Sequence, residues 1–173
     1  MKIFNAMPAV AAVVVCGLFA ACNDDDCADN QNALPLAGFY SSVTPGEKIM
    51  MDSLEVRGIG APGDSVLSAA TVAKDQLYIP FRIDSDTTIY VFKYLRSAMR
   101  QHNIADTITF IYSRSPRFVS EECGVSYVFD IRDIEVKGAM IDSVVSPEGF
   151  IDNTNVENLR IYFSTNPALS PNE

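Results

Sequence analysis

The most suggestive chemical motif in the sequence is a glycine-rich hexapeptide, Gly58-Ile59-Gly60-Ala61-Pro62-Gly63, which matches the pattern G-x-G-x-x-G. It follows a plausible strand, and Asp84 lies about 20 residues further on, as in dinucleotide-binding proteins. That chemistry also needs a helix whose N-terminal amides face the pyrophosphate. The segment 65–74 is short, carries β-branched residues, and is followed by strand-like sequence. We therefore expect the glycines to form a wide turn between strands, and we predict no cofactor.

Residues suited to hydrolysis are sparse. His102 is the only histidine, so a Ser-His-Asp triad would have to use it, and the sequence has no G-x-S-x-G elbow to expose a nucleophile. Glu121 and Glu122 could serve as the paired carboxylates of a glycosidase, but neighbouring residues on a strand point to opposite faces. The sequence therefore predicts no catalytic residues.

Oxygen ligands that could hold calcium occur together near the end of the chain, at Asp152, Asn153, Asn155 and Glu157. The spacing and the central glycine of an EF-hand are absent. Asn and Asp are also common in turns, where their side chains bond to their own backbone. We predict no metal site and keep these four residues as weak calcium candidates.

The charge balance is strongly acidic, with a net charge of −9 from 22 acidic and 13 basic residues. Such a surface is unsuited to nucleic acid, whose binding depends on Lys and Arg that neutralise phosphates. Six basic residues occur in the middle third of the chain: Arg82, Lys93, Arg96, Arg100, Arg114 and Arg117. They could form an anion-binding face if the fold brought them together, but we expect them to be scattered over the surface and solvated.

The first 34 residues look like export and tethering sequence. Lys2 precedes an apolar run that is shorter than the roughly 20 residues needed to span a bilayer, which is typical of a signal peptide. Leu18-Phe19-Ala20-Ala21-Cys22 resembles the lipobox of bacterial lipoproteins, in which the cysteine carries the lipid. We predict a signal peptide over 1–21, lipidation at Cys22 and an acidic linker over 22–34; the alternatives are an ordinary signal peptide or an uncleaved anchor.

Two further cysteines remain for the exported domain, Cys27 and Cys123. Thiols outside the cytosol usually form disulfides, so we predict that these two pair. The alternative is a reactive or metal-bound thiol, but His102 alone offers little for a metal cluster.

The rest of the chain alternates between apolar and polar residues with period two, which is typical of strands with one solvated face. The clearest runs are 54–57, 107–112, 125–132 and 159–164, and turn residues such as Pro45-Gly46, Ser115-Pro116 and Lys137-Gly138 separate them. We predict an all-β domain over 35–165, an antiparallel β-sandwich of the immunoglobulin or transthyretin kind, and a flexible tail over 166–173. Lys93 to Asn103 is the best candidate for a short helix, with an irregular crossover as the alternative.

Two stretches, 106–112 and Phe118-Val119-Ser120-Glu121-Glu122-Cys123-Gly124, resemble an uncharacterised family of Bacteroidota lipoproteins with a Val-Ser-x-Glu-Cys-Gly motif. The resemblance implies a small secreted β protein with a second cysteine near the mature N-terminus, here Cys27, in agreement with the predicted pairing. It implies no activity.

Together these features predict a lipid-anchored protein of the outer membrane, on its periplasmic face or at the cell surface. We expect a non-enzymatic binding or accessory module, held to the membrane through its lipid anchor, with an unknown protein or glycan as partner and no nucleic acid. The competing hypothesis is a hydrolase that acts on an extracellular glycan or peptide through an unrecognised site.

Overall fold

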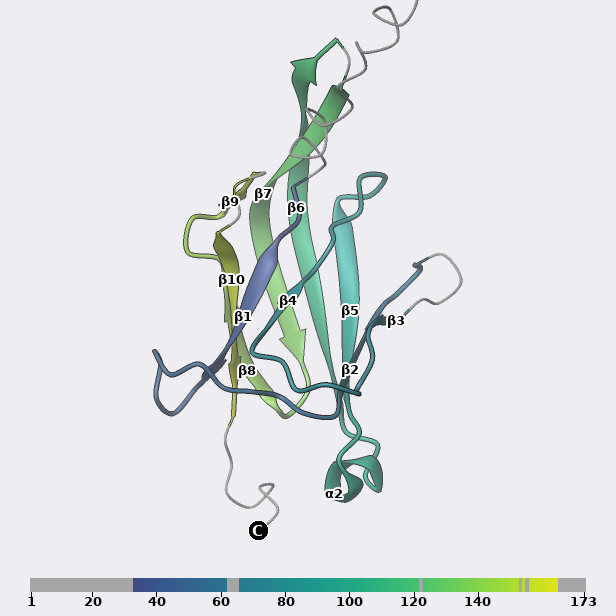
Figure 1. Cartoon of the computed structure of the whole chain (residues 1–173), viewed down its shortest axis with the longest axis vertical. Helices are drawn as coiled ribbons and strands as arrows, with labels where there is room; N and C mark the ends of the chain where they lie inside the picture. Colours follow the sequence, from purple (N-terminus) through teal and green to yellow (C-terminus); the bar gives the residue numbers. More distant parts are fainter. Residues whose placement is uncertain (1–32, 62–65, 122, 153, 155, 165–173) are drawn as a thin grey trace, which may run out of the picture.

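The computed structural model describes residues 33–61, 66–121, 123–152, 154 and 156–164. The predicted signal peptide, Cys22, Cys27, nearly all of the acidic linker and the tail lie outside these residues. The described chain is almost entirely β and forms two sheets, which confirms the predicted all-β sandwich (Figure 1).

A four-stranded sheet and a six-stranded sheet make up the two layers. The smaller sheet has the order β4 (Gln76–Tyr78), β1 (Leu36–Ser41), β10 (Glu157–Phe163), β8 (Ile141–Val145). The larger sheet has the order β3 (Val66–Ser68), β2 (Leu54–Gly58), β5 (Thr87–Tyr94), β6 (Ala105–Ser120), β7 (Gly124–Lys137), β9 (Phe150–Ile151).

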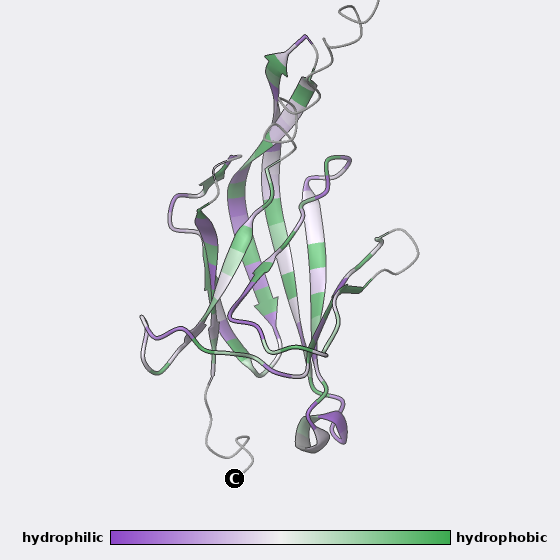
Figure 2. Cartoon of the chain, in the orientation of Figure 1, coloured by the Kyte–Doolittle hydropathy of each residue, from purple (hydrophilic) through white to green (hydrophobic). Residues whose placement is uncertain are grey.

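The strands form where the sequence alternates. Along β5 every second residue is buried, and β6 repeats the pattern with Ile108, Phe110 and Tyr112 turned inward. The alternation is visible as bands of high and low hydropathy along both strands (Figure 2). Because successive side chains point to opposite faces, this pattern places one apolar face against the other sheet.

One pairing differs from a purely antiparallel sandwich. β1 lies parallel to β10, from Leu36 beside Glu157 to Ser41 beside Phe163. The other strand pairs of both sheets are antiparallel. Alternation indicates which face of a strand is buried but not the direction of its neighbour, so the sequence could not predict this pair.

Aromatic rings fill the space between the sheets. Phe39 and Phe163 meet edge to face at 5.3 Å between ring centroids. Phe81 stacks on Tyr112 at 4.7 Å and also contacts Phe129 edge to face at 5.4 Å. Burying a ring of this size contributes about 2 kcal/mol, and ring pairs in these geometries add to it.

β6 and β7 form a long hairpin whose free end projects beyond the neighbouring strands (Figure 1). The sequence predicted a turn at Ser115-Pro116, which is wrong: β6 continues to Ser120 and Pro116 lies opposite Tyr127. β5 pairs with β6 only as far as Ile111, so among the described residues no strand borders the β6 side of the hairpin beyond that point. Proline is tolerated in such a strand because its missing N–H need not serve a neighbour.

The predicted helix is present as a single turn, α2 (Ser97–Arg100), at the other end of the molecule from the hairpin's free end (Figure 1). His102 follows it in an exposed turn. Within the described part of the chain, no helix is long and apolar enough to cross a membrane.

Candidate functional site

A pocket of about 440 Å³ opens where β2 ends and the chain enters β5. One wall is the glycine segment, in which Gly58 closes β2 and Gly60 turns with φ +72°. The opposite wall is the segment Pro80 to Asp84. Gly58 and Gly60 therefore serve the connection between strands β2 and β3, as predicted, and the next element that the structure describes after them is strand β3.

The lining of the pocket is mainly apolar. Leu67, Phe81 and Tyr90 line it alongside Pro80, while Ile59 and Ile83 are 52% and 45% exposed. Phe81 is held by its stacking on Tyr112. A concave surface with mostly apolar walls and few polar groups is typical of a ligand site.

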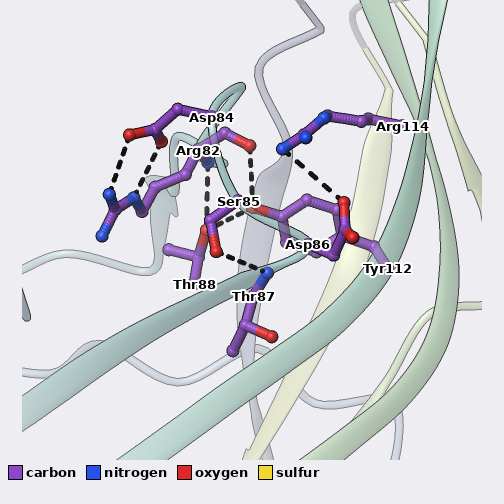
Figure 3. A network of polar contacts seen from close by, with 8 residues as sticks. All are labelled: Arg82, Asp84, Ser85, Asp86, Thr87, Thr88, Tyr112 and Arg114. Carbon is purple, nitrogen blue, oxygen red and sulfur yellow. Dashed lines mark hydrogen bonds and ion pairs between the residues drawn. The ribbon is translucent and has the colours of Figure 1, made fainter.

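Hydrogen bonds fix the Pro80–Arg82 wall to the sheet behind it, and Figure 3 shows those made by Arg82. The Tyr112 hydroxyl donates to the carbonyl of Arg82 at 2.9 Å, and the N–H of Arg82 donates to Oγ1 of Thr88 at 3.0 Å. Because Tyr112 has one proton and gives it to Arg82, Thr88 must donate in the 2.6 Å bond that joins the two hydroxyls. The Tyr90 hydroxyl donates to the carbonyl of Pro80 at 2.5 Å.

Burial raises the pKa of both Tyr90 and Tyr112 above the ordinary value, so both remain protonated at neutral pH. Their hydroxyl protons are committed to backbone carbonyls of Pro80 and Arg82. The two tyrosines therefore position the wall of the pocket.

The charges at the mouth of the pocket are paired with each other. Arg82 donates from Nε and Nη2 to the two carboxylate oxygens of Asp84, at 3.0 and 2.9 Å. The hydrogen bond from Arg82 lowers the pKa of Asp84 below its usual value. Arg82 also crosses Gly60, since a Cβ at residue 60 would lie 3.1 Å from Nη1.

Three of the basic residues of the middle third, Arg82, Arg96 and Arg114, each pair with a nearby carboxylate. Arg114 reaches Asp86 at 3.6 Å, on the other side of the loop from the Arg82 pair (Figure 3). Arg96 pairs with Asp52 at 2.8 Å beside α2. These pairs make the three side chains less available to a bound anion.

The weak calcium candidates are engaged in other bonds where the structure describes them. Asp152 accepts hydrogen bonds from the N–H and hydroxyl of Thr154, which also lower its pKa, so it closes a turn of its own backbone. Asn153 and Asn155 lie outside the described residues. Among the described residues, no group of three or more His, Cys, Asp or Glu side chains is placed to hold a metal ion.

Glu157, the fourth candidate, lies on the outer face of the smaller sheet and accepts hydrogen bonds from three side chains. The Tyr40 hydroxyl donates at 2.7 Å, and Lys48 and Arg160 each approach to 3.0 Å. Burial opposes ionisation of Glu157, but these donors outweigh it and lower the pKa. A carboxylate that is occupied by two cations is a poor calcium ligand.

The hairpin turn holds the remaining sequence candidates. Glu121 lies in the turn and not on a strand, and Glu122 lies outside the described residues. The N–H of Cys123 donates to Oγ of Ser120 at 3.0 Å. The other cysteines of the chain lie in 1–32, outside the described part, so pairing with Cys27 stays a prediction.

Sequence reasoning missed the wall of the pocket and one buried charge. Pro80, Phe81 and Ile83 carry no motif, and only the fold brings them opposite the glycines. Asp106 is fully buried. The sequence could have indicated its burial, because Asp106 occupies an inward position in the same alternation as Ile108, Phe110 and Tyr112.

A family model described as a family of unknown function (DUF6452) matches residues 53–163, which include the pocket and the hairpin. Neither the curated proteins nor the solved structures contain a match.

Proposed function

We propose that this chain, which belongs to the family of unknown function (DUF6452), is a lipid-anchored envelope protein that binds a partner through the pocket between β2 and β5 without catalysing a reaction. The observation that carries the proposal is the pocket itself. It offers about 440 Å³ of mainly apolar space on a rigid frame, and its charged groups satisfy one another.

Binding suits this pocket better than hydrolysis. The titratable groups among its lining residues are Arg82, Asp84 and Tyr90. The first two form a bidentate pair at the mouth, and Tyr90 is held protonated with its hydroxyl bonded to Pro80. General acid–base catalysis needs a group that can exchange its proton near neutral pH.

The ligand class that fits is a protein segment that inserts an apolar side chain. Arg82 and Asp84 at the mouth would then meet the polar backbone of that segment. A glycan usually needs an accessible aromatic ring, and the two aromatic residues that line this pocket, Phe81 and Tyr90, are only 7% and 5% exposed. We therefore favour a protein partner over a glycan.

The envelope location rests on the sequence around Cys22 and on the chemistry of Cys123. A charged start, an apolar run and small residues before Cys22 are typical of a processed lipoprotein leader. The predicted pairing of Cys123 with Cys27 would suit an oxidising compartment such as the periplasm or the cell surface. Cells grown with labelled palmitate should label the native chain but not Cys22→Ala, and equal labelling would contradict lipidation at this residue.

The pocket is tested with N-acetyl-leucine methylamide, the simplest mimic of an apolar side chain on a peptide. In an NMR titration the methyl groups of Leu67 and Ile83 should shift, with a dissociation constant on the order of 1 mM for so small a ligand. The methyl groups of Ile89, which lies on β5 with its side chain on the opposite face from Tyr90, should not shift.

Matched glycine variants provide the control. A side chain at residue 58 meets Tyr90 in the pocket wall, whereas nothing lies within 4 Å of a Cβ at residue 46. Gly58→Leu should abolish the shifts and Gly46→Leu should preserve them. Shifts that survive Gly58→Leu, or that spread evenly over the protein, would contradict the pocket as the binding site.

A further inference from the structure

An apolar pair lies at the free end of the β6–β7 hairpin. Phe118 and Val125 are direct partners in the ladder and are 66% and 53% exposed. Hydropathy rises again at this end of the hairpin (Figure 2). Contiguous exposed apolar patches mark interaction surfaces, whereas single exposed apolar residues are ordinary.

Phe118 and Val125 lie on the same face of the hairpin as the core residues, but beyond the point where the second sheet covers that face. Register places Tyr112 opposite Ile131 and, six residues towards the tip, Phe118 opposite Val125 on the same face. Tyr112 is buried by the core, but the hairpin extends past the other strands (Figure 1). The alternation that builds the core thus supplies an apolar surface at the tip.

The chain reaches the described domain at this hairpin. The N–H of Ala33 donates to the carbonyl of Tyr127 on β7 at 3.0 Å. Cys22 lies eleven residues earlier, a length that spans at most about 38 Å when fully extended. If Cys27 pairs with Cys123 in the hairpin turn, only five residues, or at most about 18 Å, separate the lipidated residue from the tip.

We propose that the end of the β6–β7 hairpin, centred on Phe118 and Val125, inserts into the interfacial region of the lipid surface on which the chain is anchored. This inference rests on the proposed lipid anchor at Cys22. The body of the protein is acidic, and the hairpin turn itself carries the exposed Glu121, so the part of the tip suited to approach the membrane is the apolar pair and not the turn. Arg117, exposed beside Phe118, adds a cation at the headgroup level.

Contact at the tip would fix the orientation of the domain. The lipid alone tethers the chain without orienting it. A second contact at the hairpin would hold the long axis of the domain upright on the membrane surface. The end of the sandwich that carries α2 would then face away from the membrane (Figure 1).

The absence of tryptophan from the sequence makes a direct test possible. The full lipidated chain with Phe118→Trp is reconstituted in phosphatidylethanolamine–phosphatidylglycerol vesicles whose acyl chains carry bromine near the headgroups. The tryptophan emission should shift to shorter wavelength and fall to about half, because interfacial side chains lie about 5–10 Å into the headgroup and acyl boundary. Val125→Asp in the same chain should restore most of the emission.

The matched control is Val43→Trp, since Val43 is 72% exposed in the loop after β1, well away from the hairpin's free end (Figure 1). Its emission should not change with brominated lipid. Quenching at both positions would show that the domain lies flat, which overturns the inference. A blue shift of Phe118→Trp that depends on protein concentration in the absence of vesicles would identify a second copy as the occupant, and would also overturn it.

Flotation of the same vesicles separates this inference from the proposed anchor. Chain that floats with the vesicles but shows no quenching at residue 118 overturns hairpin insertion and leaves the anchor standing. Chain that does not float overturns both. Flotation with quenching confined to the hairpin variant supports the inference.

Discussion

The hydroxyl of Tyr94 donates a 2.7 Å hydrogen bond to the carboxylate of Asp106 in the interior of the sandwich. The same carboxylate accepts the backbone N–H groups of Ala139, Met140 and Ile141. Asp106 is fully buried. One side chain therefore ties together strands β5 and β6 and the turn that connects β7 to β8.

Asp106→Asn should destabilise the fold more than Tyr94→Phe. The amide replaces an acceptor oxygen with a donor that faces backbone N–H groups, which costs about 3 to 5 kcal/mol of unfolding free energy. Tyr94→Phe removes one donor while the three N–H groups remain, and should cost about 1 to 2 kcal/mol. Urea unfolding of the two variants measures both values. A larger loss of stability in Tyr94→Phe than in Asp106→Asn would show that the three backbone N–H groups do not depend on the Asp106 carboxylate.

Alkaline pH should unfold the protein in a way that depends on Tyr94. Burial, and then the adjacent Asp106 carboxylate, raise the pKa of Tyr94 above its unfolded value near 10. The contribution of Tyr94 to the unfolding free energy is fully present below about pH 10. It is lost as the pH rises further, because the hydroxyl of Tyr94 loses its proton at a lower pH in the unfolded chain than in the folded one.

The loss should approach about 1.4 kcal/mol per pH unit for each such tyrosine. Unfolding free energies measured from pH 9 to pH 12 should therefore fall less steeply in Tyr94→Phe than in the native chain, although the variant starts from a lower value. Parallel slopes for the two proteins would contradict the role assigned to Tyr94.

Gly138 should tolerate no side chain. It adopts φ +151°, a conformation that other residues rarely take, and a Cβ there would overlap the carboxylate of Asp106. Gly138→Ala should cost about 2 to 4 kcal/mol, since the buried carboxylate must move. Gly46→Ala is the control because nothing lies within 4 Å of its added Cβ; equal melting temperatures for the two variants would refute the close approach.

How far the sequence predicts this molecule depends on whether a feature is local. The alternation in 107–112 predicts both the strand and its buried face, and it even places Asp106 inward. The parallel pairing of β1 with β10 joins the two ends of the domain and has no local signal. Pro116 misled the prediction because a proline looks the same at a turn and on a free strand edge.

The pocket shows the same limit. Gly60 lies in a turn, as predicted, and Gly58 ends strand β2 just before it, but a turn alone is not a site. The pocket exists because Thr88 and Tyr112 hold the backbone of Arg82 opposite that turn, through bonds that span 6 and 30 positions of sequence. No spacing rule connects these residues, so only the folded chain reveals the wall that they fix.

The predicted disulfide between Cys27 and Cys123 can be tested by mapping and by energetics. Peptide mapping without reduction should recover one peptide that contains both residues. The bridge would close a loop of 96 residues, for which the chain-entropy model gives about 4 to 5 kcal/mol. Cys27→Ser, Cys123→Ser and the double variant should therefore lose the same stability, because either single change removes the whole bond. Two results would show that the two cysteines act separately: a double variant whose loss of stability equals the sum of the two single losses, or free thiols at both positions in the native chain. The tether between Cys22 and the hairpin tip would then be eleven residues long instead of five.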